Sequence, residues 1–138
     1  GLQERVHFLG WRTDLARLYA DFDIFTLCSK NEGTPLSIIE AFASGCPVVS
    51  TRVGGVPDMF TDCEPQKGHR FEVKAEGALV PTQDVDALRD ALQFYIENRA
   101  LRARCGEAAR LSATLYTEEA LTQRVASLYN DLLLGSFS

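Results

Sequence analysis

Short apolar runs alternate with segments of helical periodicity along the chain, and this alternation limits the possible folds more than any other feature. The runs are bounded by glycine, proline or polar residues, as short buried strands are, and they lie at 6–9, 24–28, 47–50 and 78–80. Helical spacing of apolar residues follows the first two runs, at 15–19 and 36–43. The alternation predicts an α/β fold with a parallel sheet, right-handed crossovers and flanking helices on both faces.

The last third of the sequence predicts helices alone. Asp84 is placed to cap the start of a helix, and two apolar stripes of helical spacing follow it. The stripes are Val85, Leu88, Leu92 and Tyr95, and then Leu121, Val125, Leu128 and Leu132. We expect both stripes to pack into the core. Residues 61–76 are polar and lack periodicity, so we expect them to form a surface loop.

Composition and charge exclude several classes of protein. With 138 residues, of which 46% are hydrophobic and 24% charged, the chain has the size and composition of one folded domain. A formal net charge of -5 argues against nucleic-acid binding. Every apolar stretch is shorter than the roughly 18 residues of a membrane span, and the four cysteines lack metal-ligand spacing. We therefore expect free thiols, no membrane span and a cytoplasmic location, which includes the cytoplasmic face of a membrane.

Ligands of parallel α/β sheets bind outside the carboxyl ends of the strands. Three loops of this sequence follow predicted strands, at 10–12, 29–34 and 50–55. In the first of them, Gly10 and Trp11 lie at the expected ligand edge, where the indole ring would stack on a nucleobase or cover hydrophobic surface. We keep both interpretations of Trp11 open.

The second loop carries the most informative pattern, because Glu32 and Glu40 flank seven residues that begin with Gly33. Thr34 suits the N-cap of a helix and Pro35 its first position, which puts Glu40 about 9 Å along the helix axis, within reach of the same crevice as Glu32. The helix is apolar almost all round, so we expect Glu40 to be buried. A buried carboxylate needs hydrogen-bond donors, which are either hydroxyls of a sugar or ribose or amides of a neighbouring loop.

Together with the segments at 45–50 and 54–58, this pattern resembles the donor-binding domain of family-4-type retaining glycosyltransferases. The resemblance extends from about residue 5 to the final helix. It implies a Rossmann-like domain, the C-terminal half of a two-domain GT-B fold. It further implies a hexosyltransferase that moves a sugar, with retention, from a nucleotide diphosphate sugar to a glycan or lipid-linked acceptor in polysaccharide or glycolipid biosynthesis.

The resemblance also assigns roles to individual residues. Glu32 would act at the catalytic centre by contacting hydroxyls of the transferred sugar, and Glu40 would hold the ribose. Backbone amides around Thr34 and Leu36 would face the diphosphate, and Gly33 would let the backbone pass close to the ligand. The commoner form of the motif has glycine at position 35, whereas Pro35 has no amide hydrogen, so one expected hydrogen bond to phosphate is missing.

Measured against that family, the chain is one partial domain, 1–138. The acceptor-binding domain and the first two strand–helix units, which carry an arginine and a lysine for the diphosphate, are absent, so we expect the fragment alone to be inactive. The run at 6–9 would lose its usual partners. We expect it to pair with 24–28 or to form a strand-swapped homodimer, since bare strand edges recruit partners.

Two other site types fit less well. The Asp-Phe-Asp sequence at 21–23 matches a metal-binding pattern, but it precedes a strand and so lies at the edge away from the ligand crevice. The glycine pair at 54–55 is not a dinucleotide fingerprint. We expect neither a metal nor a cofactor besides the donor substrate. A non-catalytic ligand-binding or protein-interaction domain of the same fold stays open as an alternative function.

Overall fold

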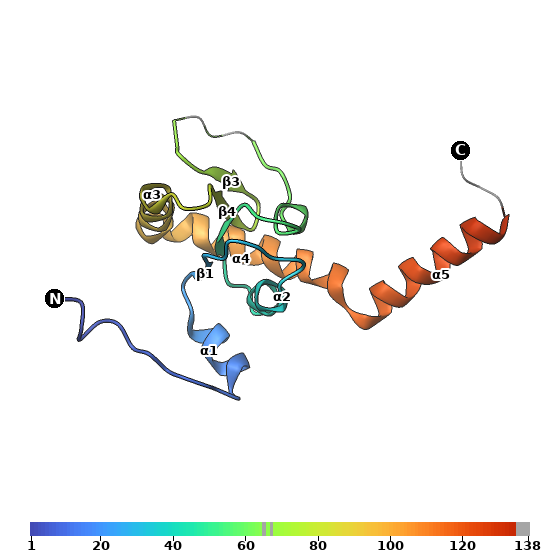
Figure 1. The fold of residues 1–138 in the computed structure, drawn as a ribbon, viewed down its shortest axis with the longest axis horizontal. Coiled ribbons are helices and arrows are strands. Elements are labelled where there is room, and N and C mark those ends of the chain that lie inside the picture. The colour runs from blue at the N-terminus through green and yellow to red at the C-terminus, as the bar shows by residue number, and fades with distance from the viewer. Residues whose placement is uncertain (65, 67, 135–138) are drawn as a thin grey trace.

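The computed structural model describes residues 1–64, 66 and 68–134. Its centre is a four-stranded sheet in the order β1-β2-β4-β3 (Figure 1). Strands β1 (Phe25–Leu27), β2 (Val48–Thr51) and β4 (Gly77–Val80) are parallel, whereas β3 (Glu72–Lys74) is antiparallel to β4. The predicted α/β class and its strands from 24 onward are therefore confirmed, and the expectation of a wholly parallel sheet is wrong.

Strand β3 lies inside the segment expected to be a loop. It has three residues, pairs with β4 and forms a single bridge from Lys74 to Asp62. Its charged ends form ion pairs: Lys74 contacts Asp62 at 2.6 Å and Glu72 contacts Arg52 at 3.1 Å. So short a strand, with one apolar residue, Val73, gives no alternating pattern in the sequence.

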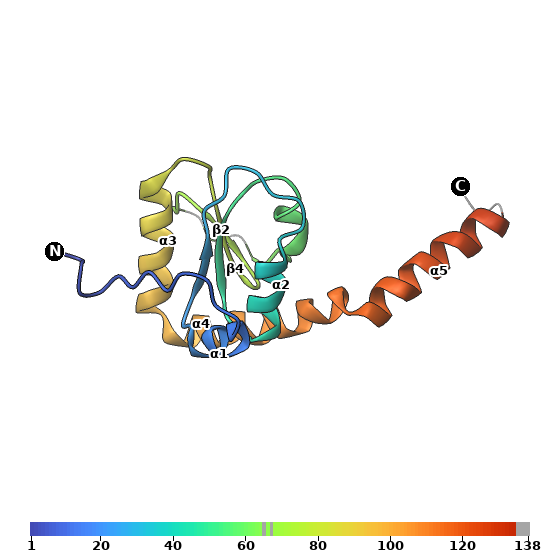
Figure 2. The ribbon, with the colours of Figure 1, turned by 60° about the horizontal axis from the view of Figure 1, so that its bottom comes forward.

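Helices cover both faces of the sheet, as Figure 2 shows. Helix α2 (Leu36–Ala43) lies on one side and α3 (Val85–Glu97) on the other, while α4 (Arg99–Ala113) runs across one end. Asp84 caps α3 as expected, since its carboxylate accepts a hydrogen bond from the Ala87 amide at 2.8 Å. Two 3-10 turns, η1 (Pro57–Met59) and η2 (Thr114–Tyr116), and the helices α1 (Leu15–Asp21) and α5 (Glu118–Leu134) complete the fold.

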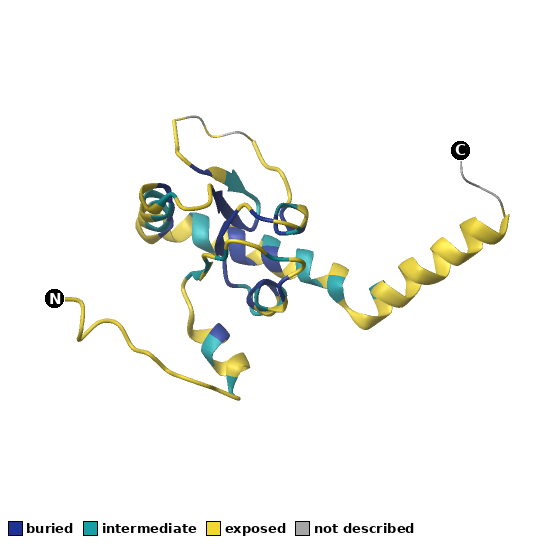
Figure 3. Ribbon diagram, viewed as in Figure 1, coloured by how far each residue is buried: buried dark blue, intermediate teal, exposed yellow. Residues whose placement is uncertain are grey.

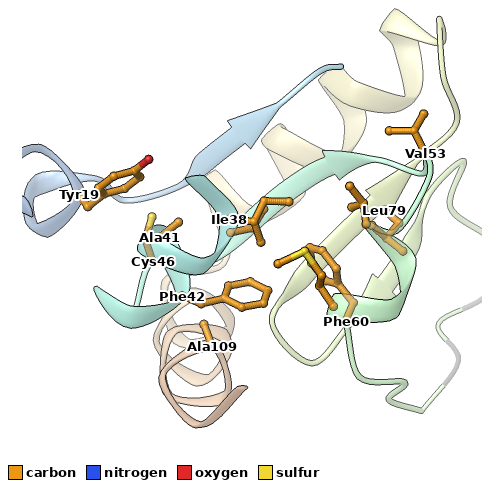
Figure 4. Close-up of a cluster of buried hydrophobic side chains, with 12 residues drawn as sticks. Tyr19, Ile38, Ala41, Phe42, Cys46, Val53, Phe60, Leu79 and Ala109 are labelled. Carbon is orange, nitrogen blue, oxygen red and sulfur yellow. The ribbon is translucent and has the colours of Figure 1, made fainter. Parts of the chain in front are cut away.

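The core has two layers because neighbouring strand residues point to opposite faces of the sheet. Val48 and Leu79 face α2, where Ile38 and Phe42 are buried (Figure 4). The other face carries the residues Val49, Ala78, Val80, Ala87, Ala91, Tyr95 and Cys105. All four cysteines are free thiols, as predicted. No helix within the described part of the chain is long and apolar enough to cross a membrane.

The predicted strand at 6–9 is wrong. Residues 1–13 are all exposed, Phe8 by 96%, and the segment leads away from the sheet (Figures 1 and 3). Within the described residues β1 pairs with β2 alone, so the expected pairing of 6–9 with 24–28 is absent. A strand without a partner leaves its backbone groups to water and gains nothing from an extended shape. The strand-swapped homodimer stays a prediction.

The second apolar stripe of the last third does form a helix, α5, but not a core. Every residue from Leu121 to Leu134 is exposed (Figure 3). Helix α5 extends from the end of η2 away from the sheet, so its apolar face has no neighbour among the described residues. The expectation that this stripe packs into the core is therefore wrong. The spacing of apolar residues predicts the apolar face of a helix, but it does not predict which element packs against that face.

Candidate functional site

The carboxyl ends of β1, β2 and β4 lie at one edge of the sheet, where the loops that follow them gather (Figure 2). On the α3 side this edge has a hollow of ≈ 180 Å³, lined by residues that include Ser29, Thr51 and Asp84. Glu32 and the start of α2 lie on the other side of the same edge. The edge is thus the place where the sequence predicted a ligand.

The loop after β1 is fixed by hydroxyl groups at the end of β2. Ser50 Oγ donates to the carbonyl oxygen of Leu27 at 3.1 Å, and Thr51 Oγ1 donates to the carbonyl oxygen of Ser29 at 2.6 Å. Both hydroxyl-bearing residues are buried. Their bonds continue the connection between β1 and β2 beyond the last paired residues, so the loop keeps a defined position relative to the sheet.

Glu32 is half-buried in this loop and is held at both its side chain and its backbone. Ser29 Oγ donates to Glu32 Oε1 at 2.6 Å, a length typical of a hydroxyl bonded to an ionised carboxylate. The Gly55 amide donates to the Glu32 carbonyl oxygen at 3.4 Å. Gly54 has φ +50°, and a Cβ there would lie 1.7 Å from that oxygen. Because glycine has no side chain, the Gly54–Gly55 pair lets the backbone of the loop that carries Glu32 pack directly against it.

Helix α2 begins one residue later than predicted. Pro35, not Thr34, is the N-cap, because its ψ of 120° is extended, and it has no side-chain cap bond. In the described residues no acceptor is bonded to the amides of Leu36 and Ser37. Leu36 is 73% exposed and Ser37 is partly exposed, so the start of the helix lies at the surface. A helix start with free amides favours an anion.

Glu40 is exposed, and the prediction that it is buried is wrong. The buried positions of α2 are Ile38, Ala41 and Phe42, which leaves Glu40 on the outer face of the helix together with Leu36. Its carboxylate neighbours Tyr19: burial first, and then the hydrogen bond and charge of Glu40, raise the pKa of Tyr19 to about 12. Glu40 needs no buried partner, and it lies one helical turn beyond Leu36.

The structure places Glu32, Gly33, Thr34, Pro35 and Leu36 in the loop after β1 and at the start of α2, whereas Glu40 is the fifth residue of that helix, beside Tyr19 of α1. It does not bring Gly10 and Trp11 there, since both lie on the exposed amino-terminal segment and Trp11 is 94% exposed. Asp23 precedes β1 and lies 3.5 Å from Arg102, away from this edge.

The sequence predicted the loops but missed two residues that fix them, Ser29 and Thr51. A signal for Ser29 was present in its spacing, because a serine three residues before Glu32 in the same loop can donate its hydroxyl to the carboxylate. Nothing local signals Thr51, because its bond joins residues 22 apart in the sequence.

Sequence comparison relates this chain to known proteins. The sequence model of the family described as Glycosyl transferases group 1 matches residues 1–112. The D-inositol 3-phosphate glycosyltransferase of Corynebacterium glutamicum is 33% identical over 135 residues, which are 96% of this chain and 30% of that protein. The chain thus spans about 30% of the length of such relatives.

Solved structures resemble the fold as well. Sucrose-phosphate synthase from Thermosynechococcus elongatus has a TM-score of 0.78 and 29% identity, covering 97% of this chain and 32% of that one. A mutant of S. aureus TarM, solved in complex with fondaparinux, α-GlcNAc-glycerol and UDP, has a TM-score of 0.75 and 26% identity, covering 94% of this chain and 24% of that one. The observed mixed sheet with flanking helices is the fold of this group of proteins.

Proposed function

Because this chain belongs to the family of group 1 glycosyl transferases, we propose that it binds a nucleotide diphosphate sugar for transfer of the sugar to an acceptor. We further propose that the transfer is of the hexosyl type, proceeds with retention at the anomeric carbon and serves a glycan or lipid-linked acceptor. The acceptor would be bound by parts of the protein outside this chain, and the reaction would take place in the cytoplasm or at the cytoplasmic face of a membrane.

The observation that carries the proposal is the position of Glu32 beside the start of α2. Ser29 takes up one carboxylate oxygen, and no described residue donates to the other. A sugar bears hydroxyl donors, and a diphosphate bears only acceptors, which match the free amides of Leu36 and Ser37. One donor molecule would therefore be complementary to both features at once.

Glu40 suits the nucleotide end of the same donor. It lies on the outer face of α2 with Leu36, so a ribose placed beyond the diphosphate would meet its carboxylate. Pro35 has no amide hydrogen and cannot donate to the phosphates, which leaves Leu36 and Ser37 as the first donors of the helix. In this proposal the departing diphosphate is stabilised by amides and by the helix dipole, with no bound metal or cofactor.

We expect substitutions of Glu32 and Glu40 to have different effects on turnover and on nucleotide binding by the full-length protein. Glu32→Gln should lower donor turnover between about tenfold and a hundredfold, the cost of losing hydrogen bonds to a charged group, and should leave the affinity for UDP, GDP and ADP unchanged. Glu40→Gln should weaken the binding of the nucleotide itself by up to about tenfold, since the free nucleotide contains the same ribose as the nucleotide sugar.

Calorimetric titration and release of nucleotide from UDP-glucose, GDP-mannose and ADP-glucose are the measurements. Glu107→Gln is the matched control, because Glu107 is an exposed glutamate on α4. If Glu32→Gln keeps full turnover with every donor that the wild type consumes, the assigned role is wrong. If the wild type binds none of them, a non-catalytic domain of this fold is the better description.

A further inference from the structure

We propose that Ser29 is a positioning residue for Glu32, and that the end of β2 fixes Ser29 in turn through Thr51. In this arrangement the Ser29 hydroxyl holds the Glu32 carboxylate in the direction in which it meets the transferred sugar. The inference rests on the function proposed above, because it takes the sugar to be what Glu32 contacts. Ser29 itself would not touch the donor through this hydroxyl.

The contact between the two side chains is short and specific. Ser29 Oγ donates to Glu32 Oε1 at 2.6 Å, and bonds from a hydroxyl to a carboxylate are among the stronger hydrogen bonds of proteins. A glutamate side chain at a half-exposed loop position would otherwise exchange among several rotamers. With Oε1 occupied, Oε2 is the oxygen left for a hydroxyl of a ligand.

The serine is itself tied to the sheet. Its carbonyl oxygen accepts a hydrogen bond from Thr51 Oγ1 at 2.6 Å, and Thr51 is buried at the end of a strand that pairs on both sides. The preceding residue, Ser50, holds the Leu27 carbonyl in the same way. The direction of the Glu32 carboxylate is therefore fixed by hydrogen bonds that lead to strand β2, and not by its own loop alone.

Loss of the hydroxyl should act on the sugar end of the donor alone. In the full-length protein, Ser29→Ala should lower the turnover of a consumed donor, such as UDP-glucose, by about tenfold, the effect of removing one hydrogen bond to a charged group. Affinity for the nucleotide without the sugar should stay unchanged. Ser29→Thr, which keeps the hydroxyl, should recover most of the turnover.

A double variant separates positioning from a general effect on the loop. If Ser29 acts through Glu32, then Ser29→Ala combined with Glu32→Gln should be no slower than Glu32→Gln by itself. Ser127→Ala is the matched control, because Ser127 lies on the exposed surface of α5. The measurements are kcat for nucleotide release from UDP-glucose, GDP-mannose and ADP-glucose, and Kd for UDP, GDP and ADP.

The outcomes distinguish this inference from the function on which it rests. Full turnover by Ser29→Ala, an equal loss of nucleotide affinity, or multiplied losses in the double variant would each overturn the positioning role while leaving Glu32 in place. Full turnover by Glu32→Gln would instead contradict the proposed function. A selective, hydroxyl-dependent loss that vanishes in the Glu32→Gln background supports the inference.

Discussion

At the scale of single residues, one buried carboxylate stabilises the fold without belonging to the candidate site. Glu76 is 1% exposed in the turn between β3 and β4. Its Oε1 accepts a hydrogen bond from Ser112 Oγ of α4 at 2.5 Å, and its Oε2 accepts one from the Thr61 amide at 2.8 Å. One side chain thus joins the segment after η1, the β3–β4 turn and the end of α4.

We expect Glu76→Ala to lower the free energy of unfolding by about 2–3 kcal/mol, because two hydrogen bonds to a charged acceptor are lost. Ser112→Ala removes one of them and should cost about 1 kcal/mol. Urea denaturation measures both, with Glu107→Ala on the exposed face of α4 as the control. Equal stabilities of Glu76→Ala and that control would contradict the role of Glu76.

At the scale of elements, the approach of α4 to the end of α2 depends on one small residue. A Cβ on Gly106 would lie 2.3 Å from the carbonyl oxygen of Gly45, and Arg110 Nη2 donates to the neighbouring Ser44 carbonyl at 3.2 Å. Alanine is a better helix former than glycine by about 1 kcal/mol, so propensity alone predicts that Gly106→Ala stabilises α4.

We expect the opposite sign. The overlap is with backbone, which cannot rotate away, and overpacking of this kind costs about 1–3 kcal/mol. Thermal or urea unfolding of Gly106→Ala tests it against Glu107→Ala one position along, where the same helix is exposed and alanine should be neutral or stabilising. A stabilised Gly106→Ala would mean that α4 lies farther from α2 than described.

The same scale shows what the sequence could predict. Helix α2 was predicted from the dense apolar residues at 36–43 and is observed there, although its start was predicted one residue too early, at Pro35. Its cap and the exposure of Glu40 were predicted wrongly, since a helix rich in apolar residues does not reveal which of its faces meets the sheet. Loop 29–34 was identified as a ligand loop, but the bond from Thr51 that fixes it depends on strand pairing, which no local pattern encodes.

At the scale of the whole molecule, two segments have apolar side chains and no partner in the described structure: 6–11 and α5. Their patterns predicted a strand and a core helix, and both expectations needed a neighbour that is not found among the described residues. The strand therefore does not form, whereas α5 does, because a helix satisfies its backbone within itself and a strand cannot.

Because the apolar face of α5 is exposed, we expect its substitution to change the free energy of unfolding very little. Leu128 is 52% exposed in α5, whereas Ile38 is fully buried in α2. Leu128→Ala should change the free energy of unfolding by less than about 0.5 kcal/mol, as surface substitutions do, while Ile38→Ala should cost about 2–5 kcal/mol. Urea denaturation followed by circular dichroism compares the two at several protein concentrations. A large, concentration-dependent cost for Leu128→Ala would show that a second copy covers α5, and a large cost without that dependence would show that α5 folds back onto its own domain.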